Sequence, residues 1–105
     1  MEASQQQEFQ FSIPDEIAGG VYSNMVLVWH TAYEFTLDFS AIEPSDSNRV
    51  PCRVVSRVRI PPTVIFDLMR ALNENMAKYE ATFGEIKRVG SQGPQPPSDD
   101  PGSDV

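Results

Sequence analysis

The chain has 105 residues, of which 40% are hydrophobic, and its 8 basic and 15 acidic residues give a formal net charge of −7. This length suits one domain, and the hydrophobic content excludes a fully disordered chain. The acidity argues against a general binder of nucleic-acid backbones and against docking on an anionic membrane. One cysteine and one histidine exclude an intrachain disulfide and a four-ligand zinc site within one chain. Because so small a domain is marginally stable alone, we expect a homo-oligomer.

The N-terminal part is predicted to hold a flexible segment, 1–7, and then a strand at 8–13, where apolar and polar residues alternate. A single helical turn is expected between Pro14 and the turn at Gly19-Gly20. Segment 21–31 favours a strand, and its middle is apolar on both faces. A strand of that kind is usually buried on both sides, so we expect a partner subunit to cover one of them.

After a tight turn at 31–34, segment 34–42 alternates cleanly and predicts a half-buried strand with Phe35, Leu37, Phe39 and Ala41 on one face. Segment 50–60 predicts another strand, with an inward face made of Cys52, Val54, Ser56, Val58 and Ile60. Its other face is then Arg53, Val55, Arg57 and Arg59. We expect these two strands to pair, so that Glu34 and Asp38 meet the arginines across the ladder.

From Pro62 the apolar period changes to that of a helix, predicted over 62–83 with Gly84 as its C-cap. Its apolar stripe is Ile65, Leu68, Met69, Leu72, Met76, Tyr79 and Phe83. The residues from 89 to 105 are rich in Pro, Gly and Asp and are predicted to be disordered. The fold class is therefore α+β, a single domain at 8–88. An antiparallel meander of three to four strands packs there against one long C-terminal amphipathic helix. The helix stripe is expected to cover Phe35, Leu37, Phe39, Val54, Val58 and Ile60.

Six pieces of sequence, in this order and spacing, resemble a family of short prokaryotic proteins, the domain-of-unknown-function 3467 family. They are G-V-Y-S-N at Gly20–Asn24, His30, E-F-T-L-D-F at Glu34–Phe39, S-R-V at Ser56–Val58, A-L-N-E-N at Ala71–Asn75 and K-Y-E-A-T-F-G-E-I at Lys78–Ile86. The resemblance implies a small soluble bacterial or archaeal protein and brings no activity, cofactor or catalytic residue. Members commonly have Ser or Thr before the first proline of the helix, where this chain has Pro61. We therefore expect a weaker helix cap, by about 1 kcal/mol.

Acid–base chemistry has one candidate cluster, His30 with Glu34 and Asp38, in which a facing carboxylate would raise the pKa of the imidazole. A surface histidine near a hairpin end is the more common arrangement. The sequence contains no nucleophile motif, phosphate loop or metal-spaced cluster. We accordingly predict no catalytic residue, no cofactor and no metal. Cys52 is interpreted as a small core residue.

A basic stripe, Arg53, Arg57 and Arg59, is the candidate for a nucleic-acid surface, with Tyr22 and Trp29 as stacking aromatics. The more common alternative is pairing of the stripe with Glu34 and Asp38. Segment 12–90 has 8 basic and 10 acidic residues, a net charge of −2, so the acidity lies mainly in the flanks. The charge argument against nucleic acid is therefore weaker for this stripe. Tyr22 and Asn24, beside the glycine pair, predict either a turn or an intersubunit contact.

These patterns predict a non-enzymatic, self-associating interaction or assembly domain, a dimer or higher oligomer, with an unidentified protein partner as a further possibility. One alternative is a holdase chaperone like the SecB export chaperones, which are similar in outline only. A second alternative is binding of RNA or another single-stranded nucleic acid. The predicted partner-binding residues are Tyr22, Asn24, Trp29, His30, Arg53, Arg57 and Arg59. Without a signal segment or an apolar run of membrane length, and with a lone thiol, the chain is expected to be cytoplasmic.

Overall fold

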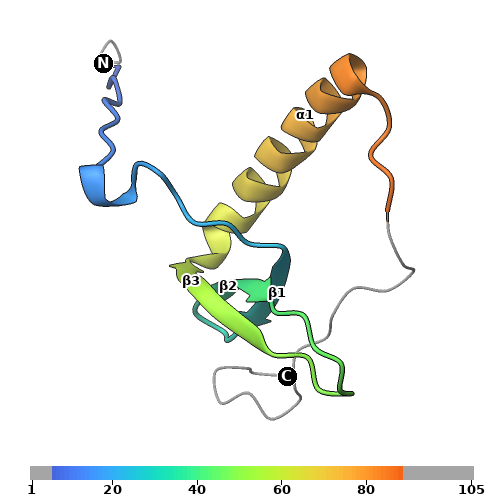
Figure 1. Ribbon diagram of the computed structural model, residues 1–105. Helices are drawn as coiled ribbons and strands as arrows, with labels where there is room; N and C mark the ends of the chain where they lie inside the picture. The colour runs from blue at the N-terminus through green and yellow to red at the C-terminus, as the bar shows by residue number, and fades with distance from the viewer. Residues whose placement is uncertain (1–5, 89–105) are drawn as a thin grey trace.

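A computed structural model describes residues 6–88 (Figure 1). The elements, in chain order, are the 3-10 turn η1 (Asp15–Ile17), strands β1 (Met25–His30), β2 (Phe35–Ile42) and β3 (Cys52–Ile60), the 3-10 turn η2 (Pro62–Val64) and helix α1 (Ile65–Phe83). The strands form an antiparallel sheet in the order β1-β2-β3. The α+β class, a meander followed by one helix, is thereby confirmed. The predicted tail 89–105 and most of the predicted flexible segment 1–7 lie outside the described residues.

The turn between β1 and β2 sets how these strands align. The backbone N–H of Thr31 donates to the carbonyl oxygen of Glu34 at 2.9 Å, and the N–H of Tyr33 donates to Oγ1 of Thr31 at 3.1 Å. This four-residue turn places His30 opposite Phe35 and Met25 opposite Ser40. Because opposed residues in an antiparallel pair share a face, the register decides which side chains meet.

The register divides the sheet into two faces of different chemistry. The apolar face carries Val26, Val28, Phe35, Leu37, Phe39, Val58 and Ile60, with His30 and Ser56 as its polar members. The Asp38 face consists of Met25, Leu27, Trp29, Thr36, Asp38, Ser40, Arg57 and Arg59. The most buried side chains lie on β1 and β2, where Leu37 is buried on the apolar face and Trp29, Asp38 and Ser40 on the other. Trp29 and Leu37 are the two buried hydrophobic residues of the described chain.

A β-bulge changes the facing of the first half of β3. Phe39 opposes Ser56, but Ser40 opposes Val54, so Val55 has no opposite residue of its own. One extra residue in a strand reverses the alternation beyond it. The predicted single inward face of 50–60 is therefore wrong for its first half. Val54 follows Ser40 to the Asp38 face, and Cys52, opposite Ile42, is exposed rather than buried in a core.

The predicted strand at 8–13 does not form. Phe9, Phe11 and Ile13 are exposed, and residues 6–14 have no strand beside them with which to pair (Figure 1). An extended segment without a neighbouring strand has no partner for its backbone groups, whatever its alternation. The predicted helical turn after Pro14 is present as η1, and Glu16, Ile17, Gly20 and Val21 then lie near Val55 and Ser56 of β3.

Helix α1 begins and ends close to the predicted residues. The chain turns at Pro61-Pro62 into η2 and α1, with no side-chain hydrogen bond capping either start, as the proline at position 61 led us to expect. Gly84 closes the helix by donating its N–H to the carbonyl oxygen of Glu80 at 3.0 Å. Figure 1 shows α1 leaving the end of β3 and diverging from the sheet. The helix therefore covers less of the sheet than its apolar stripe led us to expect, and Val54 and Val58 remain exposed.

Candidate functional site

Asp38 lies at the centre of a hydrogen-bonded group that ties the three strands together. It sits on the middle strand β2, directly opposite Arg57 of β3. The Nε and Nη2 atoms of Arg57 donate to Oδ1 and Oδ2 of Asp38 at 2.7 and 2.8 Å. Trp29 of β1 donates its indole Nε1–H to Oδ2 at 2.8 Å. Each outer strand thus supplies a donor to one buried carboxylate, which fixes the relative position of all three strands.

The charge of Asp38 is stabilised although the residue is only 2% exposed. The hydrogen bonds from Arg57 lower the pKa of this carboxyl below its ordinary value, and the bond from Trp29 adds to that effect, while burial opposes it. The guanidinium is half exposed, so the pair stays in contact with water on one side. A carboxylate that accepts three hydrogen bonds from the neighbouring strands is a structural part of the sheet. We therefore assign the group a structural role.

The predicted basic stripe is divided between the two faces. Arg57 is paired with Asp38, and Nε of Arg59 lies 3.8 Å from Oε2 of Glu34. Both arginines lie on the Asp38 face, which confirms the predicted cross-strand pairing for these two. Arg53 opposes Ala41 and so lies with the apolar face, because the bulge reverses the alternation before Ser56. The prediction that Arg53, Arg57 and Arg59 share one face is wrong.

His30 is separated from the carboxylates with which the sequence grouped it. It opposes Phe35 on the apolar side of the sheet, and the two ring centroids lie 5.7 Å apart. Glu34 pairs with Arg59, and Asp38 lies on the other face. The acid–base cluster is therefore not assembled, and His30 is an exposed side chain at the end of the hairpin.

Tyr22 and Asn24 precede β1 and have different surroundings. The side chain of Tyr22 is exposed. Asn24 contacts the end of β2 through two hydrogen bonds. Its Oδ1 accepts from the backbone N–H of Ile42 at 2.9 Å, and its own backbone N–H donates to the carbonyl oxygen of Ser40 at 3.0 Å. The Ser23 hydroxyl lies 2.8 Å from the same carbonyl oxygen of Ser40. Ser23 and Asn24 thus anchor the entry to β1.

An apolar groove lies between the apolar face and the first turns of α1. Its volume is about 590 Å³, and its walls are Val26, Val28, Phe35, Leu37 and Phe39 from the sheet and Ile65, Leu68, Met69 and Leu72 from the helix. All nine residues have hydrocarbon or thioether side chains. Beyond the groove, α1 diverges from the sheet (Figure 1). A surface of this kind is typical of a protein-binding site rather than of a site for polar chemistry.

The apolar stripe of α1 continues beyond the groove as a regular seam. We define the α1 seam as Ile65, Met69, Leu72, Met76, Tyr79 and Phe83, whose spacings are four, three, four, three and four residues. This is the spacing of the a and d positions of a heptad repeat. Most of the seam is exposed: Leu72 is 62% and Phe83 is 73% exposed. The seam therefore presents to solvent what a paired helix buries.

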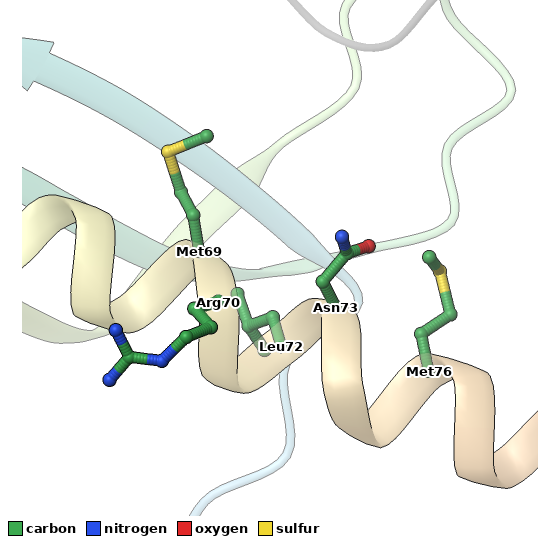
Figure 2. Close-up of a pocket in the computed structure, with 5 residues that line it drawn as sticks. All are labelled: Met69, Arg70, Leu72, Asn73 and Met76. Carbon is green, nitrogen blue, oxygen red and sulfur yellow. The ribbon is translucent and has the colours of Figure 1, made fainter.

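The middle of the seam is hollowed. Met69, Leu72, Asn73 and Met76, with Arg70 at the border, line a depression of about 500 Å³. Figure 2 shows Met69, Asn73 and Met76 rising from the same side of the helix, whereas Arg70 leaves from another. Unbranched methionine side chains adapt their shape to a partner, so this stretch suits an apolar contact surface.

Sequence reasoning identified the stripe but not the groove or the open seam. The residues that form both were predicted to pack against each other as a core. No signal in the sequence separated the two outcomes, because spacings of four, three, four, three and four average 3.6 residues, the period of any amphipathic helix.

The family model described as "Protein of unknown function (DUF3467)" matches residues 1–88. No curated protein and no solved structure matches the chain. Within residues 6–88, no three side chains of His, Cys, Asp or Glu gather closely enough to hold a metal ion. In the same part of the chain, no helix has the length and apolar character needed to cross a membrane.

Proposed function

The chain belongs to the DUF3467 family, and from that premise we propose that it is a self-associating interaction domain. In this proposal the apolar groove and the α1 seam are buried against a second copy of the chain. The observation that carries it is the seam, six apolar side chains of which most are exposed, on a helix that diverges from its own sheet. The domain acts by binding, and no step of the proposal requires catalysis.

A second copy is the favoured partner because the apolar surface needs permanent cover. Within the described residues only Trp29 and Leu37 are buried hydrophobic side chains, which is too small a core for a domain of this length. A domain with so small a core depends for its stability on an interface with a partner, as obligate homodimers do. The one partner present wherever this chain is present is another copy of it.

The size of the exposed surface agrees with an interface of ordinary dimensions. The α1 seam is carried on 19 residues, which at 1.5 Å per residue extend about 28 Å. The groove adds the side chains of two strands at one end of that length. A standard interface involves about 20–30 residues on each partner, with an apolar centre and a polar rim. The groove and the seam supply the apolar centre.

The cytoplasm is the compartment that we propose. The support is Cys52, a single cysteine whose side chain is exposed. An exposed lone thiol is better suited to a reducing compartment than to an oxidising one.

The holdase and nucleic-acid alternatives predict different uses of the same surfaces. A holdase would leave the groove open for an unfolded polypeptide, so it would suppress aggregation of a client protein as an assembled oligomer. Binding of single-stranded RNA would need several free cations on one face, whereas Arg57 is paired with Asp38 and Arg53 lies on the other face. The positions of these two arginines therefore favour self-association over binding of nucleic acid, and the aggregation assay separates self-association from the holdase.

Sedimentation velocity of the full chain across micromolar concentrations tests the proposal. We expect a dimer or a higher oligomer for the natural sequence. Leu72→Glu places a charge in the centre of the α1 seam and should weaken association about tenfold or more, as charge burial at an interface centre does. Ala71→Glu is the matched control, since Ala71 is next in sequence and outside the seam. It should leave the oligomeric state seen in sedimentation unchanged.

A second variant keeps the test decisive if Leu72→Glu fails to fold without its partner. Met76→Leu retains an apolar side chain of similar volume at the a position and should associate at least as strongly as the natural chain. A monomeric natural chain contradicts the proposal. So does a Leu72→Glu variant that folds and associates as the natural chain does.

A further inference from the structure

The two edges of the sheet differ in how well they resist pairing with another strand. In the order β1-β2-β3, the edge strands are β1 and β3. β3 carries Arg53, Arg57 and Arg59 and is flanked by Pro51 and Pro61. Charged side chains and prolines are the usual means by which an edge strand avoids pairing. β1 reads Met-Val-Leu-Val-Trp-His and contains no proline and no acidic or basic residue other than the terminal histidine.

The described chain does not cover the outer side of β1. Among residues 6–88, β1 pairs with β2 alone. The segment before it approaches β3, where Glu16, Ile17 and Val21 line a pocket with Val55, and α1 diverges from the sheet (Figure 1). In an edge strand every second residue directs its N–H and C=O outward. An apolar edge in this condition is a template for another strand.

We propose that β1 pairs antiparallel with β1 of a second copy, which joins two sheets of three strands into one sheet of six. The inference rests on the proposed self-association and specifies its geometry. Two identical edges related by a twofold axis perpendicular to the sheet meet antiparallel, and such an interface is closed after two copies. The guarded β3 strands then form the outer edges of the joined sheet, where their arginines prevent further growth.

The two faces of the sheet restrict the register of this pair. Opposed residues of an antiparallel pair lie on the same face, so Val26 and Val28 must oppose apolar-face residues of the other copy. This condition places the twofold axis at a residue and not between two residues. An axis at Leu27 sets Met25 opposite the other copy's Trp29, and an axis at Val28 sets Val26 opposite the other copy's His30. Either register pairs five residues of each strand.

The joined sheet also accounts for the apolar surface. In both registers the apolar faces of the two copies become continuous, and the two apolar grooves lie side by side on the same side of the sheet. A register shifted by one residue would bring the valines of one copy onto the Asp38 face of the other and break this continuity. The edge pairing therefore supplies the backbone part of the same interface whose side-chain part is the groove and the α1 seam.

Disulfide scanning of the full chain tests the inference. In a Cys52→Ser background, which removes the single cysteine, residues 25 to 30 of β1 are replaced one at a time by cysteine and oxidised. Moving one residue from the axis separates the two copies of a position by about 7 Å, twice the rise of a strand residue. We expect intersubunit disulfides to peak at Leu27→Cys or Val28→Cys and to decline on both sides. The natural Cys52, on the outer edge, is the control and should not cross-link.

Hydrogen exchange of the β1 backbone amides is measured on the natural chain, so it tests the pairing without any substitution. All backbone amides of β1 should be protected in the oligomer, and every second one should lose protection on dilution, as the outward groups are released. A chain that is an oligomer but shows no cross-linking in β1 overturns the edge pairing and leaves self-association standing. A monomer overturns both. Cross-linking of a β1 cysteine to Phe11→Cys of another copy would instead assign the edge to the N-terminal segment.

Discussion

Asp38 and Arg57 face each other in direct register across β2 and β3, with Nε of the guanidinium 2.7 Å from Oδ1 of the carboxylate. The same carboxylate accepts the indole N–H of Trp29 from the other side, so one side chain joins all three strands. The two ends of the pair differ in exposure, because the carboxylate is buried and the guanidinium is half exposed. Because the carboxylate is the buried partner, removing the charge of Asp38 should lower the free energy of unfolding.

Replacement of Asp38 by Asn should lower the free energy of unfolding by about 1–3 kcal/mol, the usual cost of weakening a charged hydrogen-bonded pair that is partly buried. Glu34→Gln is the matched control, since Glu34 lies 3.8 Å from Arg59 and its side chain is 40% exposed. An exposed pair of this kind contributes about 0–1 kcal/mol. Urea unfolding at one fixed protein concentration compares the two variants. Equal losses would contradict the structural role of Asp38.

The stability of the chain should depend on pH through Asp38. Its folded pKa lies below the ordinary value, which is about 3.9 in the unfolded chain. As pH falls below that value, the unfolded state takes up the proton first, so the stabilisation present at neutral pH declines and is lost as pH passes the folded pKa. The stability difference between the natural chain and Asp38→Asn should therefore shrink at acidic pH. Urea midpoints measured stepwise towards acid test this, and a difference that grows would contradict it.

The hydroxyl groups of Ser40 and Ser23 should differ in their contribution to stability. Ser40 Oγ is buried and has no hydrogen-bond partner among the described residues, whereas the Ser23 hydroxyl lies 3.0 Å from the carbonyl oxygen of Met25 and 2.8 Å from that of Ser40. Ser40→Ala removes an unpartnered polar atom and should be neutral or slightly stabilising. Ser23→Ala removes a bonded one and should cost about 1 kcal/mol. Thermal unfolding followed by circular dichroism distinguishes them, and a larger loss in Ser40→Ala would refute the assignment.

Alanine substitutions at Gly84 and Gly19 should separate the effect of backbone strain on stability from the effect of side-chain packing. Gly84 ends α1 with φ of 100°, a value that residues with a side chain rarely adopt, whereas Gly19 has no positive φ. A Cβ at either position would meet nothing within 4 Å. Gly84→Ala should therefore destabilise the chain by about 1–3 kcal/mol through backbone strain alone. Gly19→Ala should be neutral or stabilising by up to about 1 kcal/mol. Melting temperatures of the Gly84→Ala and Gly19→Ala variants check this. Equal values would contradict the strain at Gly84.

Local patterns predicted the elements that depend on local causes. The alternation at Phe35–Ile42 and the period change at the proline pair placed β2, β3 and α1 within a few residues of their observed bounds. That Glu34 and Asp38 meet arginines of β3 also followed, because strands joined by a short loop pair with each other and opposed residues share a face. The strand predicted at Glu8–Ile13 did not form, since alternation cannot supply a neighbouring strand.

The apolar groove and the α1 seam were less predictable because they depend on the bulge at Val55 and on the direction of α1 relative to the sheet. Val55 is the extra residue of the bulge, and nothing in the run from Cys52 to Ile60 marks it as such. It alone moves Arg53 to the other face and Val54 away from the groove. The direction of α1 after Pro62 decides whether its stripe covers the sheet or stays open, and a stripe of apolar residues suits both outcomes.

The sequence by itself determined the α+β class and the order of β1, β2, β3 and α1 along the chain, because composition and periodicity report what each segment must bury. Only the tertiary structure decided the register and hence which carboxylate meets which arginine. It separated His30 from the carboxylates, divided the arginines between two faces and opened the α1 seam to solvent. The physical reason is that side-chain facing depends on register, and register depends on turns, a bulge and a crossing direction that act between segments.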